Sequence, residues 1–404
     1  MELVHQLYSW VTRSDYELVA GTDWPNWESF QAGQNVPGSV YREIDDMLSQ
    51  DTEFKSKSFC VLPFYGREYP SNSVCCLLTS DANLDKIKKD MLLDIRTPAC
   101  SACWKLEDAG ILSDRLIKNK TLDYYADTSL SVLYDQCVKA ENKTVLYKID
   151  TSNTCNATCV TCGSNSSTAW GQLENRNGMT PRKAWRIKPA LTHDWINFDS
   201  ATNILFRGGE PFLSDTNFYI LEQLIAHNNT NCFVSFVTNT SFNLTSRQIE
   251  ILDQFPRKNF CFSIDGVGPV FEYMRFPLKW DKMLANLAFC REKNIDVSVS
   301  YTVSNVNLLY HDQTVAWLQE QNIPYITNLV TYPKYFSAFN WPKDLVPAVL
   351  DQISDPALVQ MITSNTQHSD QLFNVAKKEL AKQDKWKNIK IDDYLPKLAD
   401  LLHS

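Results

Sequence analysis

Several features that mark common protein classes are missing from this sequence of 404 residues. No apolar run reaches the length that a membrane-spanning helix needs, and no apolar run behind a basic segment at the start resembles a signal peptide. We therefore expect a cytoplasmic protein with no membrane partner. The formal net charge of -8 lacks the positive excess typical of proteins that bind a polyanion, so nucleic acid is not expected as a partner.

A disulfide framework is also not expected, although the sequence contains 12 cysteines. A chain of this length with 44% apolar residues can bury a core without cross-links, and cytosolic thiols stay reduced. The cysteines are instead grouped as metal ligands are, with five between residues 60 and 103 and three between residues 155 and 162. The other four lie in apolar segments and are predicted to be core residues, namely Cys137, Cys232, Cys261 and Cys290.

From about residue 145 the sequence repeats one unit, a short β-rich run followed by a polar loop and an amphipathic helical stretch. Right-handed crossovers curl such units into a barrel, and six units are fewer than the eight of a closed one. We predict an α/β fold with a partial (β/α)6 TIM-like barrel. The predicted strands are residues 145–149, 203–207, 233–238, 259–264, 296–303 and 324–330, and the predicted helices are residues 216–227, 246–255, 280–293 and 312–321.

The rest of the chain does not follow this rhythm. A small cysteine-rich module with a helical piece at residues 84–93 is predicted before the barrel, and helices are predicted after it. In this tail, the charge-mixed stretch from Lys377 to Lys390 is expected to face solvent, and Pro342, Pro356 and Pro396 are expected to break helices. The predicted divisions are an N-terminal extension (1–54), the cysteine-rich module (55–144), the barrel (145–335) and the helical tail (336–404).

Three closely spaced cysteines follow the first predicted barrel strand. Cys155, Cys159 and Cys162 fall on a loop at the end of the strand where parallel barrels keep their chemistry. Thiolates are the ligands of iron-sulfur clusters, and a four-iron cluster needs four ligands, so three cysteines leave one iron open to a reactant. A zinc site completed by a distant histidine is the alternative that the spacing leaves open.

The spacing Cys-x3-Cys-x2-Cys after a first barrel strand resembles the signature of the radical S-adenosylmethionine (SAM) superfamily. The resemblance implies that Cys155, Cys159 and Cys162 are the catalytic residues and hold a 4Fe-4S cluster whose open iron binds SAM. The cluster then passes an electron that cleaves SAM to methionine and a 5′-deoxyadenosyl radical, which abstracts hydrogen from a substrate. A flavodoxin- or ferredoxin-like reductant is implied as well. One position departs from the family, because Thr161 stands where an aromatic residue usually packs near the adenine.

Further runs at the ends of predicted strands resemble SAM contacts of the family, in the same order along the chain. The run Gly208-Gly209-Glu210-Pro211 resembles a Gly-Gly-Glu-Pro motif, in which the glycines allow close backbone approach and the carboxylate pairs with the SAM ammonium. Thr238 and Asn239 resemble the start of a Thr-Asn-Gly run, with Thr240 in place of the glycine.

The fourth and fifth predicted strands end in two more such runs. Ser263, Asp265 and the later Arg275 resemble a run of peptide-binding members, in which Ser263 meets the SAM ribose and Arg275 meets its carboxylate. Thr302 and Asn307 resemble a further SAM-contacting stretch. Each run alone could be an ordinary strand-end cap.

The N-terminal cysteines suit a second metal centre. Cys60, Cys76, Cys100 and Cys103 can form a four-thiolate shell, with Cys75 as an alternative to Cys76 because adjacent side chains rarely face the same way. Together with Glu107 and Gly110, the pattern resembles the twitch domain, a short relative of the SPASM domain that binds an auxiliary iron-sulfur cluster. Here the module precedes the barrel. A structural zinc is the alternative reading of the four thiolates.

The resemblance to peptide-binding members implies a peptide or an amino-acid-like small molecule as the substrate. Modification of a nucleotide or sugar metabolite is the second possibility for an enzyme of this class. A third hypothesis is a non-catalytic iron-sulfur electron carrier or sensor, which predicts that SAM does not bind.

Overall fold

The computed structural model describes most of the chain after residue 55. The residues described are 7–9, 56–75, 77–78, 82–108, 113–116, 118–119, 128–330, 333–364 and 368–403. Cys76, Gly110 and most of the predicted N-terminal extension lie outside these residues. Within the described residues, no helix combines the length and the apolar composition needed to cross a bilayer.

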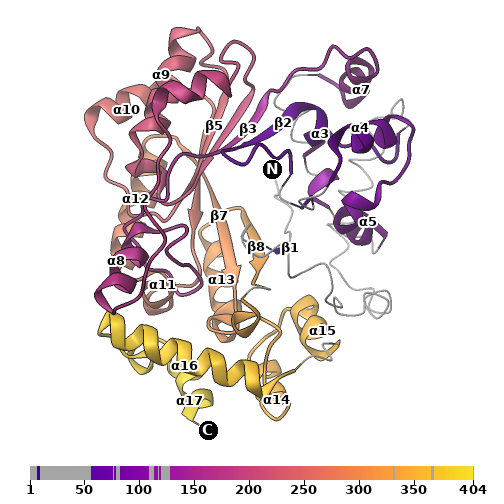
Figure 1. Cartoon of the computed structure of the whole chain (residues 1–404). Helices are drawn as coiled ribbons and strands as arrows, with labels where there is room; N and C mark the ends of the chain where they lie inside the picture. Colours follow the sequence, from indigo (N-terminus) through magenta and orange to yellow (C-terminus); the bar gives the residue numbers. More distant parts are fainter. Residues whose placement is uncertain are drawn as a thin grey trace.

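A parallel sheet of eight strands forms the centre of the described structure (Figure 1). The strand order is β1-β8-β7-β6-β5-β4-β3-β2, so β1 and β2 are its two edges and the barrel is open, as predicted. All six predicted strands are present as β3 to β8. The strands are β1 (Leu7–Ser9), β2 (Gly66–Tyr69), β3 (Leu146–Asp150), β4 (Asn203–Arg207), β5 (Phe233–Thr238), β6 (Lys258–Ser263), β7 (Asp296–Val303) and β8 (Tyr325–Leu329).

The edge strand β2 joins the cysteine-rich module to the barrel. It pairs with β3 from Gly66 opposite Leu146 onward, so a segment that was assigned to the module extends the barrel sheet. This four-residue segment is too short and too polar to show the alternating apolar pattern of a strand in the sequence. Glu68 is buried in this strand because its carboxylate forms an ion pair with Lys148 of β3 at 3.0 Å.

The two faces of the sheet differ in polarity, because side chains alternate along a strand. The face under the helices is apolar: Phe236 is fully buried and its ring lies 4.7 Å from the rings of both Phe206 and Phe212. The opposite, concave face carries hydrogen-bonding side chains. There the Asn259 amide donates to Ser235 at 3.2 Å and to Ser298 at 3.0 Å.

Helices follow the strands in turn and cover the outer face of the sheet (Figure 1). The four predicted crossover helices are present as α9, α10, α12 and α13. Thr245 and Gln248 form a capping box that fixes the start of α10. The helices of the barrel are α8 (Thr168–Arg176), α9 (Asp215–Ala226), α10 (Ser246–Asp253), α11 (Pro269–Met274), α12 (Trp280–Glu292) and α13 (His311–Glu320), with short 3-10 turns η4 (Pro189–Asp194), η5 (Pro211–Leu213), η6 (Leu308–Tyr310) and η7 (Lys334–Phe336).

The cysteine-rich module has a hydrophobic cluster of its own. Phe59, Val61, Ile87 and Met91 are among its fully buried members, and this cluster is separate from the main core around the sheet. The helices of the module are α3 (Leu62–Tyr65), α4 (Leu84–Leu92), η3 (Pro98–Cys100), α5 (Ser101–Asp108) and α7 (Leu130–Val138). Of the four cysteines predicted to be core residues, Cys137, Cys232 and Cys290 are buried, whereas Cys261 is only half-buried.

The C-terminal tail is helical, as predicted, and lies along one end of the barrel (Figure 1). Pro356 and Pro396 each begin a helix, which is the position where a missing backbone N–H costs least. Part of the stretch expected to face solvent is buried, namely Gln383 and Lys387 of α16. The helices are α14 (Val346–Leu350), α15 (Pro356–Ser364), α16 (Asp370–Lys387) and α17 (Pro396–His403), with the turn η8 (Ile391–Asp393).

Candidate active site

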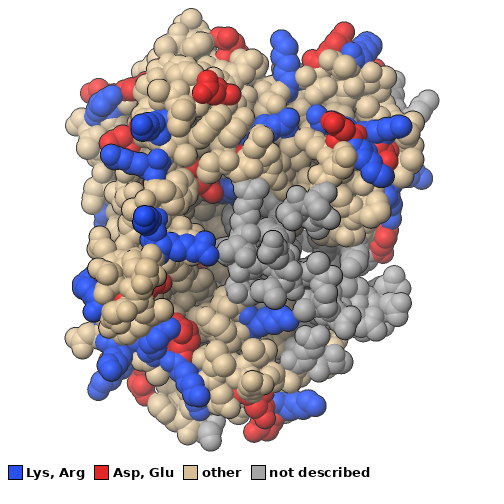
Figure 2. All heavy atoms as spheres, viewed as in Figure 1, with Lys and Arg blue, Asp and Glu red and all other residues tan. Residues whose placement is uncertain are grey.

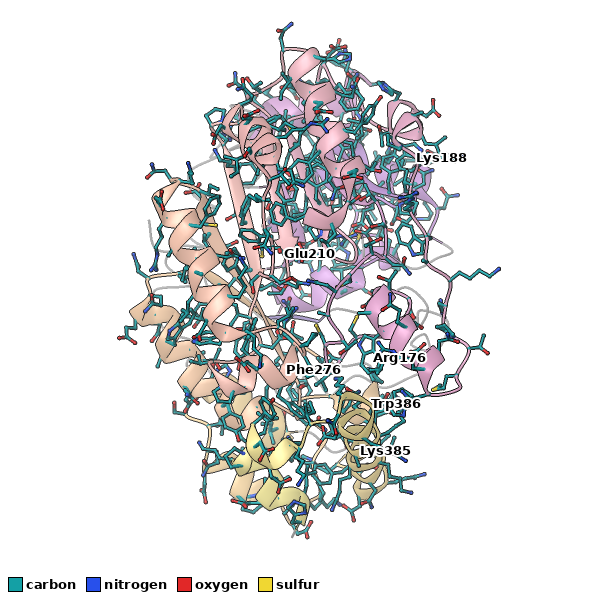
Figure 3. All side chains as sticks on the ribbon, turned by 90° about the vertical axis from the view of Figure 1, so that its left-hand side faces the viewer. Arg176, Lys188, Glu210, Phe276, Lys385 and Trp386 are labelled. Atoms are coloured by element: carbon teal, nitrogen blue, oxygen red, sulfur yellow. The ribbon has the colours of Figure 1, made fainter. Side chains whose placement is uncertain are left out.

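The loop that carries Cys155, Cys159 and Cys162 is fixed by backbone hydrogen bonds to the segment after α11. The Thr158 N–H donates to the Phe276 carbonyl at 2.7 Å, and the Val160 N–H donates to the Met274 carbonyl at 2.9 Å. In Figure 3, Phe276 lies below Glu210, between the strands and the end of α16. Both donors lie between Cys155 and Cys162, so these bonds fix the part of the loop that carries the cysteines.

The three thiols lie close enough to influence one another. Cys155 and Cys159 are half-buried, Cys162 is exposed, and none forms a disulfide. Burial and, to a smaller extent, a charge on Cys159 raise the pKa of Cys155 to about 11. A metal that binds these sulfurs must therefore displace their protons. Among the described residues, no group of three or more His, Cys, Asp and Glu side chains is arranged to hold a metal ion.

The two glycines of the Gly-Gly-Glu-Pro run let the end of β4 approach this loop. Gly208 has φ +104°, and a Cβ there would lie 2.5 Å from the Ser152 carbonyl oxygen. A Cβ on Gly209 would lie 2.2 Å from the Thr154 carbonyl oxygen. The close approach expected of these glycines is thus an approach to the backbone of the cysteine loop, which no larger residue permits.

Glu210 joins the end of β4 to the end of β5. Its carboxylate is 1% exposed and accepts hydrogen bonds from Thr238 Oγ1 at 2.8 Å and from the Asn239 N–H at 2.7 Å. Burial raises the pKa of Glu210 to about 7, and these hydrogen bonds oppose the rise. Pro211 follows at the start of η5 and is also buried.

Asn239 connects this carboxylate to the cysteine loop. Its Nδ2 donates to Asn156 Oδ1 at 2.8 Å and lies 3.7 Å from Cys155 Sγ. The next residue, Thr240, has φ +73°, the left-handed region that a glycine adopts without strain and a β-branched residue does not. Asn286 of α12 stabilises this turn by donating to the Thr240 carbonyl at 2.7 Å.

Asp265 and Arg275 form a buried ion pair at the ends of β6 and β7. Arg275 Nη2 lies 2.8 Å from Asp265 Oδ2, and the N–H of Thr302 donates to Asp265 Oδ1 at 3.1 Å. Burial is the largest single effect and lowers the pKa of Arg275, but the charge and hydrogen bond of Asp265 together with charges on Cys159 and Cys162 outweigh it, so the pKa is raised. Asn307 donates from Nδ2 to the backbone carbonyls of Asp265 and Thr302 at 2.7 and 2.8 Å.

The predicted contact of Arg275 with the SAM carboxylate stays a prediction; in this structure Asp265 occupies one of its nitrogens. Its Nε is buried and has no hydrogen-bond partner among the described residues. A charge on Arg275 lowers the pKa of Cys159, against the larger effect of burial, so the guanidinium lies near the cysteine loop. Ser263, at the end of β6, is buried beside this group. The predicted residues thus converge at the carboxyl ends of the parallel strands.

Two residues of this region were not predicted from the sequence, Gln383 and Lys387 of α16. Gln383 Nε2 donates to the Val160 carbonyl at 3.1 Å, and Lys387 Nζ donates to Gln383 Oε1 at 2.9 Å. Lys387 also lies 4.9 Å from the ring centre of Trp170, whose Nε1 donates to the Cys159 carbonyl at 2.9 Å. Burial lowers the pKa of Lys387 to about 8.

A signal for these two residues exists in the sequence. They continue the helical spacing of the buried residues Phe373, Ala376 and Leu380. Because both residues are polar, a search for apolar residues at helical spacing does not identify them as buried.

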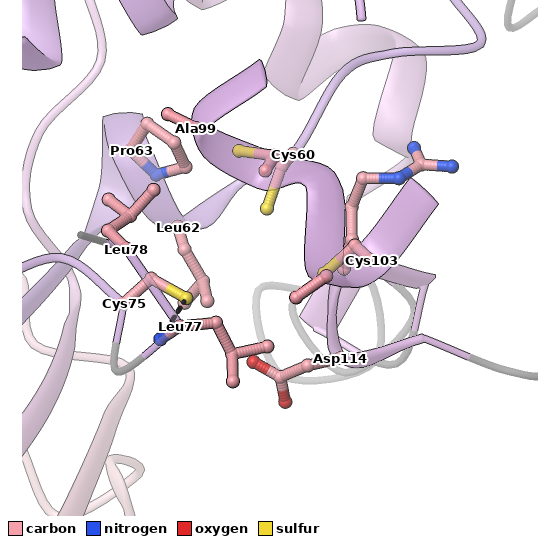
Figure 4. Close-up of a pocket in the computed structure, with 12 residues that line it drawn as sticks. Cys60, Leu62, Pro63, Cys75, Leu77, Leu78, Ala99, Cys103 and Asp114 are labelled. Carbon is pink, nitrogen blue, oxygen red and sulfur yellow. Dashed lines mark hydrogen bonds between the residues drawn. The ribbon is translucent and has the colours of Figure 1, made fainter. Parts of the chain in front are cut away.

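The N-terminal cysteines line one pocket (Figure 4). Cys60, Cys75, Cys100 and Cys103 all contribute to it, whereas Cys76, the other candidate of the adjacent pair, lies outside the described residues. Burial raises the pKa of Cys100 to about 11 and that of Cys103 to about 12. The remaining lining is mostly apolar and includes Leu62, Pro63, Leu77, Leu78 and Ala99.

Comparisons with known proteins give structural likeness without a match in sequence. No protein-family model and no curated protein matches this chain. Three solved structures are similar to parts of it: anSMEcpe with bound AdoMet (18% identity, 51% of this chain and 59% of that chain, TM-score 0.39), Streptococcus suis SuiB bound to precursor peptide SuiA (15%, 68% and 63%, 0.38), and TYW1 with a lysine-pyruvate adduct bound (10%, 50% and 70%, 0.30). The chain spans about six-tenths of the length of the first two. These superpositions are partial and assign no function to its residues.

Proposed function

We propose that the chain is a cytoplasmic radical SAM enzyme that acts on a peptide or an amino-acid-like substrate. Cys155, Cys159 and Cys162 would hold a four-iron four-sulfur cluster that leaves one iron open for SAM. When bound, this cluster supplies the electron that cleaves SAM to methionine and a 5′-deoxyadenosyl radical, which can take hydrogen from a substrate. The observation that carries the proposal is Asn239, which contacts both Cys155 and Glu210 and so joins the thiol loop to the polar strand ends.

The donor set suits such a cluster. Three free thiols lie on one loop, and thiolate is the ligand type that iron-sulfur clusters use. Backbone bonds from Thr158 and Val160 fix this loop independently of any metal. Arg275 supplies a positive charge beside thiolates that would carry negative charge when ligated.

The neighbouring side chains would bind and orient SAM. The Nε of Arg275 is a buried donor without a partner, which suits the carboxylate of SAM because a charged donor left unpaired is costly. Glu210 accepts several hydrogen bonds but, as a carboxylate, has further lone pairs for an ammonium. Burial of Glu210 excludes water from the carboxylate that the SAM ammonium would contact.

A polar substrate suits the concave face of the sheet. Amides and hydroxyls line it, including Asn259, Ser298 and the pair formed by Asn328 and Ser300 at 2.8 Å. Peptide groups offer donors and acceptors that match the remaining hydrogen-bonding capacity of such a surface. The run of Ser263, Asp265 and Arg275 that resembles peptide-binding members borders the same face.

A second metal centre in the N-terminal module is part of the proposal, as an auxiliary iron-sulfur cluster or a structural zinc. The support for this centre is that Cys60, Cys75, Cys100 and Cys103 line one pocket. Four thiolates suit either metal. Cys76 remains a candidate beside Cys75.

The test replaces Cys155, Cys159 and Cys162 together by Ala in protein reconstituted anaerobically with iron and sulfide. The variant should lose one cluster and all dithionite-dependent production of 5′-deoxyadenosine from SAM, because only these thiols leave an iron open. Iron content, chromatography of 5′-deoxyadenosine and the paramagnetic resonance signal with and without SAM are measured.

The matched control is Cys232→Ala, which removes a buried thiol far along the chain from the loop. It should keep the cluster and the activity. SAM cleavage by the triple variant, or a wild-type resonance signal that never responds to SAM, would contradict the proposal. If a nucleotide or sugar stimulates release of 5′-deoxyadenosine and no peptide does, the proposed substrate class is wrong but the proposed SAM cleavage still holds.

A further inference from the structure

A run of positive charge without a matching negative charge lies next to the cysteine loop. Residues 176–188, named here the basic strap, contain Arg176, Arg182, Lys183, Arg186 and Lys188. No Asp or Glu occurs from residue 175 to residue 193, although the whole chain carries a net charge of -8. The local charge of the strap is therefore opposite in sign to that of the protein.

The strap faces solvent. All five basic residues are exposed, and none of them forms an ion pair with another described residue. Figure 3 shows Arg176 and Lys188 on the same side of the molecule, and Figure 2 shows Lys and Arg side chains spread along the left half of its face. Trp185, in the middle of the strap, is 37% exposed. Exposed cations with no internal partner are available to an external one.

Hydrogen bonds attach the strap to the chain on both sides of the three cysteines. The Ile187 N–H donates to the Thr151 carbonyl at 2.7 Å, and the Trp185 N–H donates to Asn153 Oδ1 at 2.9 Å. At the other end of the loop, the Arg182 N–H donates to Ser164 Oγ at 3.2 Å. The strap is therefore attached directly to the residues that flank the cysteine loop on both sides.

We propose that the basic strap is the docking surface for an acidic one-electron carrier protein of the flavodoxin or ferredoxin class. The inference rests on the proposed function, which consumes one electron for each SAM cleaved. The carrier is oxidised by one electron, and that electron enters the centre held by Cys155, Cys159 and Cys162. Charge complementarity would orient the carrier so that its redox group faces the cysteine loop.

The position of the strap favours a carrier over a substrate. A substrate must reach the concave face, where Asn259 and Ser298 lie, whereas an electron donor needs only a short path to the thiols. The strap pairs with residues 151–153 through the bridge between Ser152 and Arg186, on the opposite edge from Gly209, which bonds to the Ser152 carbonyl. The strap thus lies against the segment that leads into the cysteine loop, on the side away from Gly209.

The test compares two charge-reversal variants of the reconstituted enzyme. One carries Arg182→Glu, Lys183→Glu and Arg186→Glu; the matched control carries Lys89→Glu, Lys139→Glu and Lys293→Glu, three exposed lysines elsewhere that give the same change in net charge. The probe is a purified FMN-loaded flavodoxin with an acidic surface. Its dissociation constant is measured by calorimetry at low and at physiological salt, and 5′-deoxyadenosine production is measured with reduced flavodoxin and with dithionite.

The strap variant should bind flavodoxin at least about tenfold more weakly at low salt and lose most of its salt dependence, while the control changes by less than about twofold. Dithionite should support both variants equally, because a small reductant needs no docking surface. Equal loss of binding in both variants, or unchanged binding in the strap variant, would overturn the inference. So would a strap variant that fails only in binding a peptide substrate. Absence of dithionite-driven cleavage in the wild type would instead remove the proposed function.

Discussion

A buried arginine–carboxylate pair lies beside each group of cysteines, and the two pairs are built differently. In the N-terminal module, Arg115 uses Nε and Nη2 on the two oxygens of Glu107, at 2.9 and 2.7 Å, and Nη1 on the Phe59 carbonyl at 2.7 Å. In the barrel, Arg275 uses Nη2 on both oxygens of Asp265, at 2.8 and 3.0 Å, and leaves Nε without a partner.

The difference indicates different tasks. All three guanidinium nitrogens of Arg115 donate hydrogen bonds to the protein, so Arg115 stabilises the module around a mostly apolar pocket. Arg275 keeps one buried donor free within a polar network, which favours a role in binding an anion. The N-terminal pocket therefore suits a permanently bound group, because each guanidinium nitrogen of its arginine already has a partner. The barrel site suits a reactant, because Arg275 keeps one donor free to bind it.

The largest expected effect tests whether the N-terminal pocket is a metal centre at all. Replacing Cys60, Cys100 and Cys103 by Ala should remove that centre completely and leave the barrel centre, because each is coupled to the folding of its own ligands. Metal content distinguishes the cases: about eight irons falling to about four for a second four-iron cluster, or loss of zinc alone for a zinc site.

The control for this change is Cys137→Ala, which removes a thiol of the same hydrophobic cluster that does not line the pocket. It should retain both centres. If the triple variant keeps the wild-type metal content, the N-terminal pocket is not a metal centre, and its cysteines are core residues.

A smaller effect separates the two arginines. Arg115→Lys should lower the free energy of unfolding by about 2–3 kcal/mol, because lysine cannot reproduce the fork on Glu107 and the bond to Phe59, and it should leave SAM affinity unchanged. Arg275→Lys should cost less than about 1 kcal/mol, since lysine keeps a bond to Asp265, but should weaken SAM binding about tenfold.

Urea unfolding measures the first quantity for both variants, and calorimetry with SAM on reconstituted protein measures the second. Each variant serves as the control for the other, because both make the same substitution in a buried ion pair. Normal SAM affinity together with a large loss of stability in the Arg275 variant would make both arginines structural.

The smallest expected effect concerns backbone strain. Thr240 in the barrel site has φ +73°, whereas Asn72 in the N-terminal module has φ +55° but is a residue type that tolerates this region better. Thr240→Gly should therefore raise the free energy of unfolding by about 1 kcal/mol, and Asn72→Gly should raise it by less. Urea unfolding of both variants measures the difference; an equal change in both would mean that Thr240 stores no particular strain.

The sequence predicted the barrel well because each of these strands and helices is marked by a pattern within its own stretch of residues. Strands such as Asn203–Arg207 and Phe233–Thr238 are short apolar runs bounded by turns, and each is followed by a helix of the right length. Chain order then fixes a parallel sheet, and a parallel sheet brings the ends of all its strands to one edge. The convergence of the cysteine loop with Glu210, Asn239 and Asp265 follows from that rule.

Other features could not be predicted, because they depend on which residues meet across the fold. β2 is too short and polar to be recognised, and it is a strand because its backbone pairs with that of β3, where Glu68 also meets Lys148. The glycine pair was expected to allow a close backbone approach, but only the fold shows that Gly208 and Gly209 lie against the backbone of residues 152–154. Such contacts join segments tens of residues apart, so no local pattern records them.

The sequence by itself determined the fold class, the order of the strands and the chemical types gathered at their ends, because periodicity and spacing encode these directly. Only the tertiary structure decided how those groups share their bonds. It placed Cys75 in the N-terminal pocket, paired Arg275 with Asp265, and brought Gln383 and Lys387 from the far end of the chain to the cysteine loop. A polar side chain is buried only where a partner offsets its loss of water, and the position of that partner is a property of the folded chain.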